Sequence, residues 1–132
     1  MLAVGVISAV IIWKNFRPSP GKPYEQVTLE QAMTFMDYET DYILVDIGSE
    51  DAFSEEHLDG AVNMPYEELG SRVSVVLPDK NQQIYVYGRD PKESEMAARK
   101  LCTLGYTNIT EIEDVRVHMG AVPGSTEASN QF

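Results

Sequence analysis

The stretch that decides the fold runs from Gln83 to Ser94 and reads Gln-Ile-Tyr-Val-Tyr-Gly-Arg-Asp-Pro-Lys-Glu-Ser. Residues 84–87 are apolar, aromatic and partly β-branched, which predicts a strand. Residues 88–94 predict a loop of six or seven residues, because apolar residues at helical spacing follow it directly: Met96, Ala97, Leu101 and Leu104. In open α/β sheets ligands bind in such loops, at the carboxyl ends of the strands. The free N–H groups at the start of the next helix suit an anion, so this loop is the first candidate site.

Strand and helix signals alternate along the rest of the chain. Further strands are predicted at 24–28, 42–47, 61–63 and 108–112, and helices from 29, over 49–56, over 67–76 and over 92–104. Thr28 with Gln31 predicts a capping box, Ser49 a second N-cap, and Gly105 a left-handed C-cap. Alternation with short joins predicts an α/β fold whose central parallel sheet of about five strands carries helices on both faces. Two apolar helix faces are expected: Leu29, Ala32, Met33 and Met36, then Leu69, Val73, Val76 and Leu77.

The two ends of the chain differ in composition from the part between them. Residues 1–17 contain the apolar run Leu2–Trp13, residues 18–23 are a Pro-rich linker, 24–119 form the expected domain, and 120–132 predict a disordered tail. The apolar run would extend only ~18 Å as a helix, against a hydrocarbon core ~30 Å thick. It fits a short membrane anchor, a signal-peptide core or an apolar segment packed on the domain. An uncleaved anchor, followed by Lys14 and Arg17, would place the domain in the cytoplasm, whereas a cleaved signal would export it, in bacteria to the periplasm.

Charge and cysteine content limit the function. The 132 residues carry a formal net charge of −11, which argues against a nucleic-acid partner because phosphate contacts need Lys and Arg. The chain has one cysteine, Cys102, so no intramolecular disulfide forms. His57 and His118 are the only histidines, and they lie too far apart in sequence for metal-ligand spacing. We therefore expect no metal and no other cofactor.

Four stretches of the chain together resemble the rhodanese-like family. They are Asp41–Asp46, Glu56–Pro65 (Glu-His-Leu-Asp-Gly-Ala-Val-Asn-Met-Pro), the strand and loop at 84–94, and 97–109. Their order and spacing match the family from about Val27 to Asp114, and His57–Pro65 is the most specific part. The resemblance implies a sulfurtransferase-type fold in which a cysteine of the loop carries a persulfide.

The loop departs from the family pattern at three of its positions. The resemblance puts the family's cysteine at Gly88, a loop glycine at Pro91 and a loop arginine at Glu93, whereas Arg89 and Ser94 still fit. Another arginine of the family falls at Gly48. The fold is therefore expected without the nucleophile. Two interpretations remain open: an inactive binding or regulatory module, tethered through its N-terminus and acting on a protein partner, or a thiosulfate sulfurtransferase whose loop cysteine is replaced at Gly88.

The remaining candidate residues have structural as well as chemical interpretations. Cys102 lies near the end of its helix, where the helix dipole opposes a thiolate, and is expected to be a small buried residue. The resemblance places Asp46 beside the loop, where it can accept N–H groups or pair with Asp59 as acid and base. It also indicates that His57 fixes a turn by hydrogen bonding.

The loop itself offers a few groups that could hold a small anion. Arg89, Lys92 and Ser94 are the candidates. Asp90 and Glu93 oppose them, each by up to ~4 kcal/mol at ~4 Å and an effective dielectric constant of ~20. Tight anion binding is therefore not expected.

Overall fold

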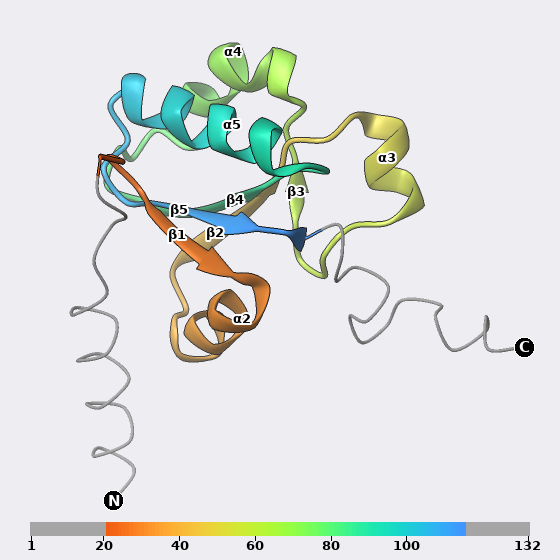
Figure 1. Cartoon of the computed structure of the whole chain (residues 1–132). Helices are drawn as coiled ribbons and strands as arrows, with labels where there is room; N and C mark the ends of the chain where they lie inside the picture. Colours follow the sequence, from red (N-terminus) through yellow and green to blue (C-terminus); the bar gives the residue numbers. More distant parts are fainter. Residues whose placement is uncertain (1–20, 116–132) are drawn as a thin grey trace, which may run out of the picture.

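The computed structural model describes residues 21–115, in which five strands form one parallel sheet (Figure 1). The order across the sheet is β1-β5-β4-β2-β3, and every neighbouring pair is parallel. The elements, in chain order, are β1 (Glu25–Thr28), α2 (Leu29–Tyr38), β2 (Tyr42–Asp46), α3 (Glu50–Glu55), β3 (Val62–Asn63), α4 (Tyr66–Val76), β4 (Gln83–Tyr87), α5 (Pro91–Thr103) and β5 (Ile109–Glu113). The α/β fold with about five parallel strands is confirmed.

Helices cover both faces of the sheet, as Figure 1 shows with α4 and α5 on one side and α2 on the other. The central strand β4 serves both layers, because successive side chains of a strand point to opposite faces. Ile84 and Val86 join the α4–α5 layer, whereas Tyr85 and Tyr87 join the α2 layer. Two apolar cores therefore share one sheet. Gly88, the next residue, falls on the α4–α5 side by the same alternation.

The predicted caps begin and end the helices where expected. Thr28 and Gln31 form a capping box at α2, and the Ser49 side chain accepts a hydrogen bond from the Ala52 N–H at 3.1 Å. Gly105 follows α5 with a φ of +100°, a conformation that favours glycine. These local signals are strong because each one satisfies a backbone group that the helix end leaves unpaired.

Two residues of the expected apolar helix faces are exposed, Met33 at 41% and Val76 at 44%. Met96, which falls at helical spacing with Ala97 and Leu101, is also 44% exposed. Phe35 contacts the core from α2, and Ala98 is fully buried on α5. The spacing of apolar residues fits more than one choice of buried helix face, and these choices differ by about one residue along the helix. Packing against the sheet determines which face is buried.

Several expectations concern parts of the chain outside the described residues. These are the Leu2–Trp13 segment, residues 18–20 of the Pro-rich linker, His118 and the 120–132 tail. Within residues 21–115, every helix is too short or too polar to cross a bilayer.

Candidate functional site

The loop between β4 and α5 is shorter than the sequence pattern indicated. It consists of residues 88–90, because α5 already begins at Pro91. The Asp90 side chain accepts a hydrogen bond from the Glu93 N–H at 2.9 Å, and Pro91 occupies the first turn. Both features favour an early helix start. The expected loop of six or seven residues is therefore wrong, and Lys92, Glu93 and Ser94 belong to the first turn of α5.

Gly88 lies buried at the start of this loop, close to the side chains of Glu93 and Ile47. A Cβ added to Gly88 would lie 2.8 Å from Glu93 Oε1 and 2.9 Å from Ile47 Cδ1. Glu93 Oε1 also accepts a hydrogen bond from the Arg89 N–H at 3.2 Å. The Glu93 carboxylate therefore occupies the space beside Gly88 and uses a loop N–H that an external anion could otherwise bind.

Asp46 organises the other side of the loop. Its side chain is fully buried and accepts three hydrogen bonds: from Arg89 Nη1 at 2.7 Å, from the Gly48 N–H at 2.8 Å, and from the Tyr87 hydroxyl at 2.8 Å. These groups meet because Asp46 pairs with Tyr87 at the carboxyl ends of adjacent strands. A buried carboxylate needs this number of donors to offset the loss of water.

The Arg89 guanidinium is held by two acceptors of the protein itself. Its Nη2 donates to the Glu56 carbonyl at 2.8 Å while Nη1 pairs with Asp46. A Cβ added to Gly48 would lie 3.1 Å from Arg89 Nη1. A side chain at residue 48 would therefore press on the ion pair, and glycine there leaves room for the arginine.

Tyr87 connects this ion pair to the turn before β3. Its hydroxyl accepts from the Leu58 N–H at 2.9 Å and donates to Asp46. Burial, more than the nearby Asp46 carboxylate, raises the pKa of the Tyr87 hydroxyl well above its usual value, so this group stays protonated. Sequence reasoning missed Tyr87, although its place at the last position of β4 is where side chains reach a loop.

His57 and Asp59, the candidate residues in the turn before β3, are exposed, unlike Asp46. His57 is exposed, stacks on Phe53 with ring centroids 3.8 Å apart, and forms a hydrogen bond between Nδ1 and the Phe53 carbonyl at 2.7 Å. The histidine thus fixes the end of α3. Asp59 is exposed in the following turn, whereas Asp46 is fully buried. The expected structural role of His57 agrees with these contacts.

Ser94, one of the candidate anion contacts, is instead directed into the protein. Its hydroxyl donates a hydrogen bond to Glu111 Oε2. Both residues are buried, with exposed fractions of 2% for Ser94 and 0% for Glu111. Gln26 Nε2 donates to the other oxygen of Glu111 at 2.9 Å. Burial raises the pKa of Glu111, and the hydrogen bonds from Ser94 and Gln26 oppose that rise. Nothing in the pattern of β5 distinguishes this carboxylate from a solvated one.

Cys102 lies far from the loop along α5. The distance from Pro91 is about 16 Å at 1.5 Å per residue. The thiol is partly buried, and its sulfur lies 3.6 Å from the Pro23 carbonyl oxygen. Burial raises the pKa of the thiol, and Arg99 opposes the rise. Between residues 21 and 115 no three His, Cys, Asp or Glu side chains gather as metal ligands would.

The fold agrees with that of known proteins. A family model described as the rhodanese-like domain matches residues 28–114, and the chain therefore belongs to the rhodanese-like family. Thiosulfate sulfurtransferase PspE of Escherichia coli is 32% identical to the chain over 65 residues, which are 49% of the chain and 62% of that protein.

Two further similarities cover more of the chain. Adenylyltransferase and sulfurtransferase UBA4 of Candida albicans is 31% identical over 74% of the chain and 22% of its own length. The chain thus spans less than two thirds of either of these curated relatives. The solution structure of the rhodanese-like domain of the Alr3790 protein from Anabaena superposes with a TM-score of 0.62 at 25% identity, over 70% of this chain and 69% of that one.

Proposed function

We propose that this rhodanese-like domain does not transfer sulfur and instead serves as a binding or regulatory module for a protein partner. The observation that carries the proposal is the position of Glu93. Its carboxylate lies 2.8 Å from the place where a side chain at Gly88 would begin. The resemblance puts the family's persulfide-bearing cysteine at that residue.

The chemistry of sulfur transfer explains why this arrangement matters. The nucleophile in such reactions is a thiolate, which needs a cationic or N–H-rich setting. Here residue 88 has no side chain, and Glu93 has already taken the Arg89 N–H. Arg89 itself is paired with Asp46. The positive groups of the loop are therefore satisfied by the protein's own carboxylates.

Cys102 does not replace the missing nucleophile. It is partly buried at the opposite end of α5, and burial raises the pKa of its thiol. Its sulfur contacts a backbone carbonyl, which does not stabilise a thiolate. A thiol in this setting reacts slowly at neutral pH.

The second candidate function is thiosulfate sulfurtransferase, with a cysteine replaced at Gly88. The observation in its favour is the similarity to thiosulfate sulfurtransferase PspE, together with the intact pairing of Asp46 with Arg89. On this interpretation the scaffold remains competent, and restoring the thiol restores activity.

A thiosulfate-to-cyanide assay on four chains separates the two functions. The chains are the unsubstituted sequence, Gly88→Cys, Gly88→Cys with Glu93→Ala, and Gly88→Cys with Glu95→Ala as the matched control, since Glu95 is a glutamate of the same helix that pairs with Arg99. We expect only the Glu93→Ala combination to gain activity, and the other three chains to match a denatured control. Activity of the unsubstituted chain would overturn the proposal. Activity of Gly88→Cys alone would support the second function.

We also propose that residues 1–17 attach the domain to a membrane through the apolar run Leu2–Trp13. Trp13 suits the interface, and Lys14 and Arg17 suit an anionic headgroup region. Flotation of the full chain with vesicles that contain anionic lipid, beside a chain lacking residues 1–17, tests this. Equal flotation of both chains would refute it.

A further inference from the structure

The edge of the sheet at β2 is only partly covered. On one side β2 pairs with β4 along its whole length, from Tyr42 to Asp46. On the other side only Val45 and Asp46 pair with β3, which has two residues. Among residues 21–115, Tyr42–Leu44 therefore have no strand partner on the β3 side, which leaves an edge of about 10 Å at 3.3 Å per residue.

Backbone groups of β2 face this open edge. The Asp46 carbonyl accepts a hydrogen bond from the Met64 N–H at 2.9 Å, so the peptide groups of Asp46 face β3. Backbone groups of a strand alternate between its two sides, so those of Leu44 and Tyr42 face the same way. The pairing of Val45 with Val62 already uses the Leu44 carbonyl, so the open groups are the Leu44 N–H and both peptide groups of Tyr42. Exposed groups of this kind are a template for an added strand.

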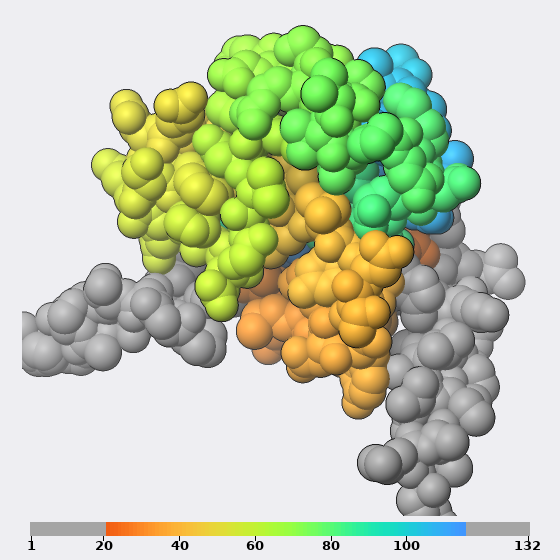
Figure 2. Space-filling model, turned by 180° about the vertical axis from the view of Figure 1, so that it is seen from behind, coloured from red at the N-terminus to blue at the C-terminus, as the bar shows by residue number. Residues whose placement is uncertain are grey.

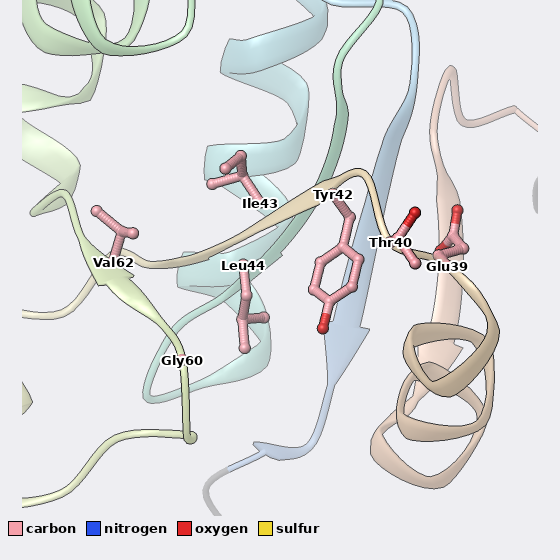
Figure 3. A pocket seen from close by; sticks show the side chains of 7 residues that line it. All are labelled: Glu39, Thr40, Tyr42, Ile43, Leu44, Gly60 and Val62. Carbon is pink, nitrogen blue, oxygen red and sulfur yellow. The ribbon is translucent and has the colours of Figure 1, made fainter.

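A groove of about 470 Å³ runs along this edge. Figure 3 shows its two walls, with Gly60 and Val62 on one side and Glu39 and Thr40 at the end of α2 on the other. The side chains of Tyr42 and Leu44 point to one face of β2, and that of Ile43 to the other. Figure 2 shows the same hollow from behind, between the orange surface of α2 and β2 and the yellow-green surface around β3. The volume is within the range of natural ligand pockets.

Among the described residues, the one charged side chain that lines the groove is acidic. It belongs to Glu39, which accepts a hydrogen bond from the Tyr85 hydroxyl, and burial raises the Glu39 pKa. Asp41 and Asp59 adjoin the lining residues Thr40 and Gly60 in sequence, and both are exposed, with Asp41 Oδ1 accepting a hydrogen bond from Gln82 Nε2 at 3.2 Å. The residues that line the groove include no Lys or Arg. A bound segment would therefore gain from basic side chains.

From these features we infer that the groove binds an extended segment of a partner protein as an additional strand on β2. The segment would carry apolar side chains toward Tyr42, Leu44 and Val62 and at least one Lys or Arg toward Glu39 or Asp41. Main-chain hydrogen bonds supply affinity in this binding mode, and side-chain contacts supply specificity. This surface is separate from the Gly88 loop, so the inference holds whether or not the domain transfers sulfur.

A second copy of the chain fits the groove less well. Two copies that paired through β2 would bring their acidic residues together, and the chain as a whole has a net charge of −11. Like charges at an interface oppose association.

Titration of the full chain with three synthetic peptides tests the inference. The first peptide alternates Lys with Val, the second alternates Glu with Val, and the third is the Lys–Val peptide with every second Val replaced by Pro, which lacks an N–H. Affinity is measured by fluorescence anisotropy, and the site by amide NMR shifts and hydrogen exchange. We expect only the Lys–Val peptide to bind, with protection of the Tyr42 and Leu44 amides.

Charge reversal at the rim supplies the specificity control. We expect Asp41→Lys with Asp59→Lys to weaken binding of the Lys–Val peptide about tenfold at ~0.05 M salt. Glu67→Lys, an exposed glutamate of α4, is the matched control and should leave the affinity unchanged. Equal binding of the Pro peptide, equal weakening by Glu67→Lys, or shifts confined to other amides would overturn the inference. Protection of the edge amides by self-association in the absence of peptide would also overturn it.

Discussion

Replacement of Asp46 by alanine should destabilise the domain strongly, because three donors depend on this one carboxylate. Arg89, Gly48 and Tyr87 all donate to it, at 2.7–2.8 Å, and the Asp46 side chain is fully buried. A neutral hydrogen bond contributes about 1 kcal/mol and one to a charged group about 2 kcal/mol. All three bonds are to a charged group, so they sum to about 6 kcal/mol. Because bonds to one carboxylate are not independent, and removal of one partner of a buried ion pair costs about 3–5 kcal/mol, we expect a loss of about 5 kcal/mol.

Urea unfolding followed by circular dichroism measures this free energy. The matched control is Asp59→Ala, at an exposed aspartate of the neighbouring turn, which should change the free energy of unfolding by less than ~0.5 kcal/mol. Tyr87→Phe should cost about 2 kcal/mol in the otherwise unchanged chain and less in the Asp46→Ala background, because its acceptor is then already gone. A cost below ~1 kcal/mol for Asp46→Ala would refute the view that Asp46 organises the loop.

Two further predictions concern buried polar groups elsewhere. Tyr24 is 2% exposed, and its hydroxyl has no hydrogen-bond partner among residues 21–115. Tyr24→Phe should therefore leave the free energy of unfolding unchanged or raise it slightly. Tyr106→Phe removes hydrogen bonds to the carbonyls of Val73 and Leu77 and should lower the free energy of unfolding by ~1 kcal/mol. Equal losses from the two variants would contradict this. Burial raises the Glu25 pKa from 4.5 to about 6, so the folded state holds this proton more tightly than the unfolded chain does. The contribution of protonated Glu25 to the free energy of unfolding is fully present below pH ~4.5 and is lost as the pH rises through about 6. The melting temperature should therefore fall between pH 5 and pH 7, and it should fall less in Glu25→Gln. A melting temperature that rises over this interval would be the contrary result.

Local sequence signals predicted most of the fold. The apolar run at 42–47 and the residues 84–87 form β2 and β4, two of the three inner strands, and Thr28 and Ser49 begin their helices as expected. These features depend on neighbours in the chain, so a short window of sequence contains them. The pair Asp90 and Pro91 is also a local signal for the start of α5, because Asp favours the N-cap and Pro the first turn. Alignment of residues 88–94 with the family's loop predicted a later helix start instead.

Features that depend on distant contacts were not predictable. Ser94 and Glu111 are polar residues that satisfy each other only because α5 packs on β5. The exposure of Met96 and the burial of Ala98 follow from the same packing. Glu93 lies beside Gly88 because of the orientation of α5 about its own axis. Sequence periodicity alone does not determine that orientation.

The crowding around Gly88 also constrains how this loop can change in evolution. A Cβ at residue 88 would meet the ends of the Glu93 and Ile47 side chains at less than 3 Å, so any side chain there requires both of them to move. A side chain at residue 88 that displaces the Glu93 carboxylate also breaks its hydrogen bond with the Arg89 N–H. Residues 88 and 93 are therefore coupled, and we expect a change at one position to alter which residues the other accepts.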